Sequence, residues 1–217
     1  MLGRFFLFGG KMKEGNKPLN FDPTSVGIDD ACDSKLPIKT DPMTMFLSEG
    51  SIARHREYAR DLRLKYSILQ KSETLLNSSD IKEIQWQKTK KDLYNEAFPL
   101  LAEYTLHTLF FSSFTERAAD SDTRLLCGGI HGAKLLNQLF DLGKNDNDGG
   151  FLLISISGKK LDAKRIFPPY ADLKIRTPIL AVDLCEHCYF SDYGFDRRRY
   201  LVSALSHLDL ARISDFL

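Results

Sequence analysis

The sequence lacks the features that would mark a membrane-spanning, secreted or strongly charged protein. It has no run of 18 apolar residues, so no transmembrane helix is expected. Its 30 Lys and Arg residues almost balance its 29 Asp and Glu residues, and a net charge of +1 gives no whole-chain argument for nucleic-acid or membrane binding. The four cysteines are not spaced like a secreted disulfide framework, which favours a reducing compartment, the cytosol or the mitochondrial matrix.

The remaining composition is that of an ordinary globular protein. Apolar residues make up 43% of the chain and charged residues 27%. A length of 217 residues allows one sizeable domain, or two small ones that share an interface.

Residues 1–35 are rich in Gly, Asn, Asp, Pro and Lys, show no sustained period, and are predicted to form an extended arm. The first residues, MLGRFFLFGGKMK, carry three basic side chains and no acidic one. This composition is compatible with a mitochondrial targeting segment, although it is poor in Ser. The alternative is an ordinary tail or a docking strand.

Two helices are expected next. Ser48 is a plausible N-cap, and apolar positions recur after it at steps of three and four, at Ile52, His55, Ala59, Leu62, Tyr66 and Leu69. Residues 74–90 are polar and lysine-rich, and are predicted to be a loop or the exposed start of the next helix. A second helix is predicted over 92–114, interrupted at Pro99, with an apolar and therefore buried second half.

The C-terminal part mixes helices and strands. A short helix is predicted over 133–142, strands over 151–156, 163–167 and 179–183, and a final helix from Asp196 to about Ile213. Strands joined by a tight turn imply a small antiparallel sheet. The predicted fold is α+β: an arm (1–35), an N-terminal helical-hairpin domain (36–118), and a C-terminal domain (119–217) with a three-stranded antiparallel sheet and flanking helices.

Four residues could together hold a metal ion. Asp183 ends the last predicted strand, His187 follows four residues later, and His55 and His107 lie on buried helical surfaces. A lone histidine in such a place is most often a core residue, but three imidazoles and one carboxylate suit Mn or Fe with an open coordination position. Zn is an alternative, although sulfur ligands are more usual in its structural sites.

The sequence Cys185-Glu-His-Cys188 has a second interpretation, as half of a zinc knuckle or as a redox CxxC motif. No second CxxC motif and no thioredoxin-like βαβ pattern accompanies it. The metal-site interpretation is therefore preferred.

These residues lie in motifs that resemble the iron/manganese superoxide dismutase family. TPILAVDLCEHCYFSDYGFDRRRY resembles its C-terminal signature, HTLFFSSF its His-Thr-Phe-Tyr-Trp helix, LSEGSIARH the start of its first helix, and LPIKTDPM its N-terminal segment. The resemblance covers about residues 36–217. It implies Fe or Mn held by His55, His107, Asp183 and His187, with Glu103, Cys185 and Tyr189 around them. It also implies a dimer in which Glu186 bonds a ligand histidine of the other subunit.

The chain departs from the family pattern around this site. A histidine and a tyrosine that line the family's substrate funnel are replaced by Ala59 and Arg63, a glutamine by Glu103, and an arginine by Gly194. In addition, two tryptophans are replaced by Phe151 and Leu153, and a second tyrosine by Phe190. The resemblance therefore assigns no residue as catalytic and argues against an efficient enzyme.

Two functions are compatible with this pattern. The first is a superoxide-dismutase-like structural subunit in a mitochondrial assembly, such as the small subunit of the mitochondrial ribosome, paired in a homodimer or a heterodimer with a related chain. The lysine-rich stretch 82–91 would then be a solvated face or a phosphate contact. The second is a working iron or manganese superoxide dismutase. The expected location is the mitochondrial matrix, or otherwise the cytoplasm.

Overall fold

The structure is a computed structural model that describes residues 41–77, 83–116, 125–126, 130–145, 149–157, 160–170, 173 and 177–216. The predicted arm and targeting segment lie outside the described residues, and so do Cys32 and Cys127. The boundaries proposed at 35 and 118 stay predictions. No helix in the part of the chain that the structure describes is long and apolar enough to cross a membrane.

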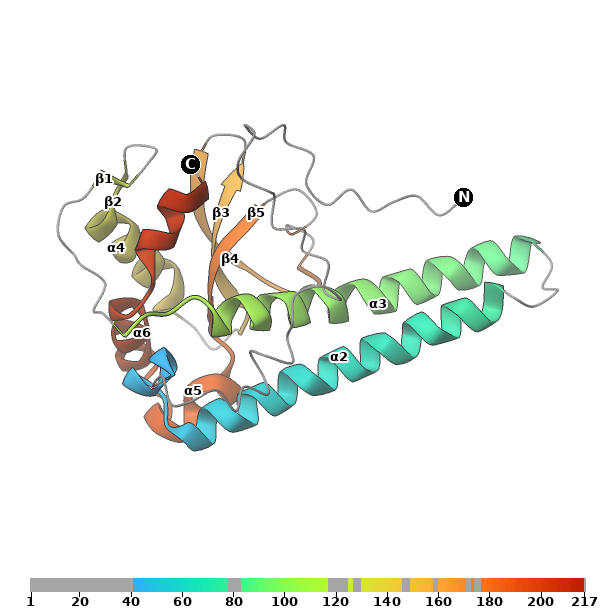
Figure 1. The fold of residues 1–217 in the computed structure, drawn as a ribbon, viewed down its shortest axis with the longest axis horizontal. Coiled ribbons are helices and arrows are strands. Elements are labelled where there is room, and N and C mark those ends of the chain that lie inside the picture. The colour runs from blue at the N-terminus through green and yellow to red at the C-terminus, as the bar shows by residue number, and fades with distance from the viewer. Residues whose placement is uncertain are drawn as a thin grey trace.

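A long antiparallel helical hairpin forms the N-terminal half of the described chain. The 3-10 helix η1 (Pro42–Met45) begins at Asp41, whose Oδ1 accepts a hydrogen bond of 3.0 Å from the Met43 backbone N–H. Helices α2 (Glu49–Asn77) and α3 (Glu83–Phe111) follow, each of 29 residues and thus about 43 Å long at 1.5 Å per residue. Figure 1 shows α2 and α3 side by side, with their far ends projecting beyond the rest of the fold.

One prediction for this hairpin is confirmed in part and the other is wrong. Residues 83–90 are the start of α3, which is the second of the two alternatives given for residues 74–90, while residues 74–77 complete α2. Pro99 lies inside α3 instead of interrupting it. Packing of α3 along α2 therefore outweighs the cost of an internal proline, about 3 kcal/mol.

The C-terminal half is built around a three-stranded antiparallel sheet in the order β4-β3-β5. The strands are β3 (Phe151–Ser157), β4 (Lys160–Ile166) and β5 (Thr177–Asp183), so β4 begins three residues earlier than predicted. Before them come a two-stranded ladder of β1 (Leu125–Leu126) and β2 (Ile130–His131), and helix α4 (Gly132–Gly143). The predicted α+β class is confirmed.

The chain ends in three helical pieces, not in the single helix that was predicted. They are α5 (Glu186–Tyr193), α6 (Arg197–Ser206) and the 3-10 helix η3 (Leu210–Phe216). The break after α6 has a physical cause, because the Asp209 N–H donates to the Ser113 carbonyl, 2.9 Å away, and this bond draws the chain to the end of α3. Helix α5 was missed entirely, although it carries one of the predicted ligands.

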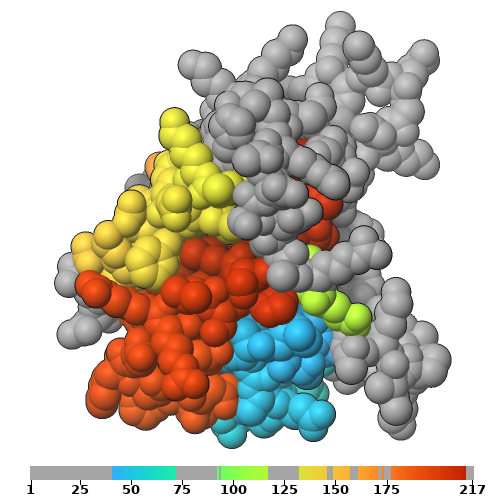
Figure 2. All heavy atoms as spheres, turned by 90° about the vertical axis from the view of Figure 1, so that its left-hand side faces the viewer, coloured from blue at the N-terminus to red at the C-terminus, as the bar shows by residue number. Residues whose placement is uncertain are grey.

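The core joins the hairpin to the sheet. Strand β5 is buried from Pro178 to Asp183 and packs against α3, while α4 packs against β4. The Ser113 hydroxyl accepts a hydrogen bond of 2.9 Å from the Ala181 N–H, which ties the end of α3 to β5. Figure 2 shows a second junction, where the orange α5 region borders the blue start of α2. There the Asp192 carboxylate accepts from the Ser48 N–H at 3.0 Å.

Candidate metal centre

The fold brings the four predicted ligands together from four different elements. His55 comes from the second turn of α2, His107 from the last part of α3, Asp183 from the end of β5, and His187 from the first turn of α5. Their ligand atoms all lie within 4.8 Å of one another. The three residues His55, His107 and Asp183 are buried, whereas about one third of the His187 side chain is exposed.

The spacing of these atoms fits a single ion. From Asp183 Oδ2, the Nε2 atoms of His55, His107 and His187 lie at 3.0, 3.4 and 3.3 Å. His107 Nε2 and His187 Nε2 are 3.4 Å apart. Ligand atoms about 2.1 Å from one metal stand about 3.0 to 3.4 Å from each other in octahedral or tetrahedral geometry.

The hydrogen bonding of the site also fits a cation. His55 Nε2 and Asp183 Oδ2 are fully buried and only 3.0 Å apart, yet neither has a hydrogen-bond partner among the described residues. A buried polar atom without a partner costs about 1–3 kcal/mol. A shared ion would bind both atoms through their lone pairs and remove this cost.

The tautomer of His107 is set by its own helix. Its Nδ1 lies 2.8 Å from the carbonyl oxygen of Glu103, one turn earlier in α3. Because a carbonyl oxygen only accepts, Nδ1 carries the proton and the Nε2 lone pair faces the other ligands. Metal-binding histidines are commonly fixed in this way by the second ring nitrogen.

The protonation states follow from burial and from the central carboxylate. Burial lowers the pKa of His55 to about 4 and keeps its imidazole neutral. Burial by itself raises the pKa of Asp183, but its contacts with His107, His187 and His55 outweigh this and hold the pKa well below its usual range. The site therefore offers a neutral imidazole at His55 and an ionised carboxylate at Asp183, the forms of these groups that bind a metal.

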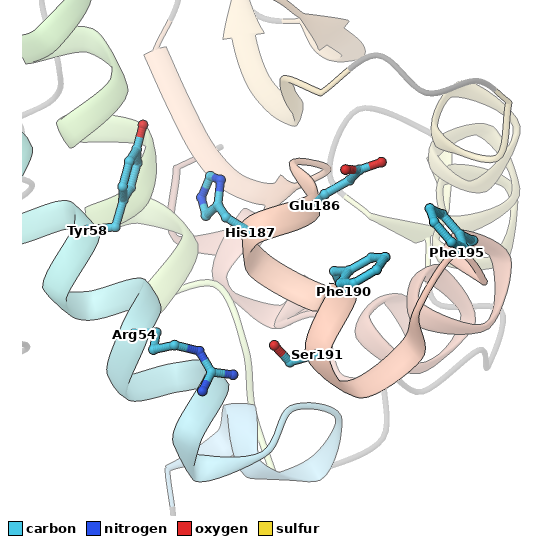
Figure 3. Close-up of a pocket in the computed structure, with 7 residues that line it drawn as sticks. All are labelled: Arg54, Tyr58, Glu186, His187, Phe190, Ser191 and Phe195. Atoms are coloured by element: carbon cyan, nitrogen blue, oxygen red, sulfur yellow. The ribbon is translucent and has the colours of Figure 1, made fainter.

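The centre opens to solvent on one side. A pocket of about 580 Å³ reaches His187 and is lined by residues of the start of α2 and of the α5 region: Arg54, Tyr58, Glu186, His187, Phe190, Ser191 and Phe195 (Figure 3). A small molecule that enters this pocket meets the most exposed ligand first. The buried sides of the centre are closed by aromatic side chains such as Phe110 and Phe151.

Tyr58 is a pocket residue beside the predicted ligands that the sequence analysis missed. Its hydroxyl donates a hydrogen bond of 2.7 Å to Glu103 Oε1, and its ring packs on His187 with a centroid distance of 4.6 Å. The expected positions for a funnel residue were Ala59, which is buried, and Arg63, which is exposed. The available signal was the step of three from His55 to Tyr58, which places both side chains on one face of a helix.

The other predicted residues lie around the centre without joining it. The Cys185 thiol is half-buried and accepts a hydrogen bond of 3.4 Å from the Gly150 N–H. Tyr189 is buried, and its hydroxyl accepts from Arg197 Nε at 3.0 Å. Glu186 is exposed and lines the pocket. The cluster of ligand atoms found among the described residues contains no cysteine sulfur.

The pocket also contains a positive charge that does not come from the expected position. Gly194 stands where the arginine was expected, and it ends α5 with a positive φ of 57°, a conformation that favours glycine. Arg54 of α2 lines the pocket in its place, with Nη2 donating to Ser51 Oγ at 3.3 Å.

Fold and site together define a protein in which a cluster of three histidines and one aspartate, suited to a single metal ion, lies between a helical hairpin and an α/β unit. Residues 137–215 match the family model for iron/manganese superoxide dismutases, C-terminal domain. The match contains Asp183 and His187, while the hairpin supplies His55 and His107. The chain is related to the iron/manganese superoxide dismutase family, and its His–Asp cluster is suited to iron or manganese. No curated protein matches the chain.

Proposed function

We propose that this chain binds one iron or manganese ion and uses it in a redox reaction of a small oxygen species. Superoxide is the substrate that the family relationship suggests. The observation that carries the proposal is the convergence of three imidazoles and one carboxylate, with His187 open to a pocket. When bound, the ion would supply alternating oxidation and reduction.

The chain's own residues would position the reactants. His55, His107 and Asp183 hold their side of the site dry, because all three are buried. Tyr58 packs its ring on His187 and directs its hydroxyl to Glu103, and Arg54 places a cation in the same pocket (Figure 3). Tyr58 and Arg54 thus provide a tyrosine hydroxyl and an arginine charge in the pocket, although the family's own tyrosine and arginine positions are occupied by Arg63 and Gly194. The pocket therefore supports the proposal of an active enzyme more strongly than the sequence alone.

A second function is favoured by the shape of the hairpin. The far ends of α2 and α3 project beyond the body of the protein, which is the form of a part that docks into a larger assembly (Figure 1). In this proposal the chain is a structural subunit of a mitochondrial assembly, such as the small subunit of the mitochondrial ribosome, and the metal site maintains the fold. Residence in the mitochondrial matrix belongs to the same proposal.

In either case we propose that the chain forms a dimer through the surface around Glu186. Relatives in the superoxide dismutase family are typically oligomeric, and Glu186 is exposed next to the metal ligand His187. Two exposed aromatic rings, Phe190 and Phe195, lie beside it with a centroid distance of 5.1 Å. Apolar side chains of this size on a surface favour a protein contact.

The two functions separate in one set of measurements on the purified full chain. Iron, manganese and zinc are quantified by mass spectrometry, and consumption of superoxide and of hydrogen peroxide is assayed with and without chelator. The redox proposal expects stoichiometric iron or manganese and chelator-sensitive turnover. Bound metal without turnover, together with co-sedimentation with ribosomal subunits, would support the structural proposal instead.

A further inference from the structure

The hydrogen-bonded pair of Tyr58 and Glu103 links the two helices of the hairpin at the open side of the metal centre. The Tyr58 hydroxyl of α2 donates to Glu103 Oε1 of α3 across 2.7 Å. The Tyr58 ring lies 4.6 Å from the His187 ring and 5.3 Å from the His107 ring, centroid to centroid. The pair therefore lines the pocket next to two of the predicted metal ligands, His107 and His187.

The charge of Glu103 acts on this open side. Glu103 and His107 are one helical turn apart on the same face of α3, which places their Cβ atoms about 5–6 Å apart. Burial raises the pKa of Tyr58, and the hydrogen bond and charge of Glu103 raise it further. The Glu103 carboxylate thus lies at the hydroxyl of the tyrosine whose ring packs on the exposed ligand His187.

The other charges around the pocket do not cancel that of Glu103. Arg54 is the cation among the lining residues and Glu186 is the carboxylate, so the lining by itself is balanced. Arg54 also lies close enough to Asp192 to help hold the pKa of that carboxyl below its usual value, after the hydrogen bonds from Ser48 and Ser51. Glu103 therefore adds one carboxylate beside a lining whose Arg54 and Glu186 charges balance each other.

We propose that the Tyr58–Glu103 pair is a specificity-determining element that weakens the binding of small anions at the open side of the centre relative to neutral ligands of the same size. The inference rests on the proposed function, because the pair selects ligands only beside a bound ion. Tyr58 acts through Glu103: its hydroxyl binds one carboxylate oxygen and disperses the charge that an anion would otherwise meet.

The test compares ligand affinities of metal-loaded variants. Azide is the anionic probe, titrated by its absorption change on the ferric protein, and nitric oxide is the neutral probe, titrated on the ferrous protein. Glu103→Gln keeps an oxygen that can accept from Tyr58 but removes the charge, and should tighten azide binding about tenfold. The affinity for nitric oxide should change by less than about twofold, because a neutral ligand has no net charge to interact with Glu103. Glu57→Gln makes the same chemical change on the exposed face of α2, and should alter neither affinity.

Tyr58→Phe supplies the second arm. It keeps the ring on His187 and removes only the hydroxyl, so it should weaken azide binding about threefold in the wild-type background. In the Glu103→Gln background the same change should have less than half of this effect, since no charge remains to be dispersed. Metal content and melting temperature are measured for every variant, so that a folding defect is seen directly.

Two results would overturn the proposal while leaving the proposed function intact. One is metal-loaded Glu103→Gln protein that binds azide no more tightly than Glu57→Gln protein. The other is a Tyr58→Phe effect of equal size in both backgrounds, which would mean that Tyr58 does not act through Glu103. A wild-type protein that binds no iron or manganese would overturn both proposals together.

Discussion

Replacing Asp183 by Asn is the substitution that probes the centre most selectively. Asp183 Oδ1 accepts a hydrogen bond of 2.8 Å from the Cys185 N–H, while Oδ2 faces three imidazole nitrogens. Asparagine keeps the shape and can keep the Oδ1 bond, but it removes the anionic ligand. Its amide can donate to a neighbouring imidazole nitrogen, so the metal-free variant should fold at least as well as the metal-free wild type.

The expected loss of metal affinity in Asp183→Asn follows from the contribution of one ligand out of four. Structural four-ligand sites are worth about 10–16 kcal/mol, so one ligand accounts for about 3 kcal/mol, or roughly a hundredfold in affinity. With metal at about a thousand times the wild-type dissociation constant, binding stabilises the wild-type fold by about 4 kcal/mol and the variant by about 1.4 kcal/mol. For a chain of this size the corresponding rises in melting temperature are about 10 °C and about 4 °C.

Thermal unfolding followed by circular dichroism, with iron or manganese and with chelator, measures both rises. Asp61→Asn, an exposed position on α2, is the matched control and should behave like the wild type. An Asp183→Asn variant with the full wild-type rise would refute the assignment of this carboxylate as a ligand. An unchanged wild-type melting temperature with and without chelator would contradict a stabilising metal site altogether.

Three further changes test the surroundings of the centre. Ser113→Ala removes a buried hydroxyl that accepts a hydrogen bond from a β5 N–H at 2.9 Å. Chemical denaturation should show that the free energy of unfolding falls by about 1–3 kcal/mol. A fall smaller than the error of the fit would mean that water replaces the hydroxyl. Gly150→Ala places a Cβ 2.3 Å from the Ile166 carbonyl oxygen at a φ of +94°. The free energy of unfolding should therefore fall by more than about 2 kcal/mol. A variant of wild-type stability would show that the strands do not come this close at Gly150. Burial lowers the pKa of His187 but the Asp183 carboxylate outweighs it and raises the pKa above the ordinary 6.5. Protons therefore compete with the metal at neutral pH, and metal titrations between about pH 5 and pH 9 should show affinity rising with pH to a plateau; a flat profile would contradict the assignment of His187 as a ligand.

The ligand set could be predicted from the sequence because its residue types are rare on buried surfaces. Asp183 ends a strongly apolar strand, and His55 and His107 stand on apolar helical stripes where an imidazole needs a partner. The structure brings these three together with His187. Whether they bind metal as ligands stays a prediction.

The parts that escaped prediction depend on contacts between distant segments. The step of three from His55 places Tyr58 on the same face of α2, but its hydrogen bond to Glu103 of α3 could not be predicted from the sequence of α2 alone. Helix α5 is short and follows the strand after two residues, so no apolar period could develop. The composition of residues 74–90 left a loop and a helix start both open, and α2 and α3 are longer than predicted where they lie side by side (Figure 1).

The central claim is that one iron or manganese ion is held by three imidazoles and the Asp183 carboxylate. X-ray absorption spectroscopy at the metal edge of the purified, metal-loaded protein tests it most directly. The account predicts a first shell of nitrogen and oxygen only, at about 2.0–2.2 Å, with the outer-shell pattern of three imidazoles. A sulfur shell at about 2.3 Å, which would place the ion on Cys185 or Cys188, would contradict it.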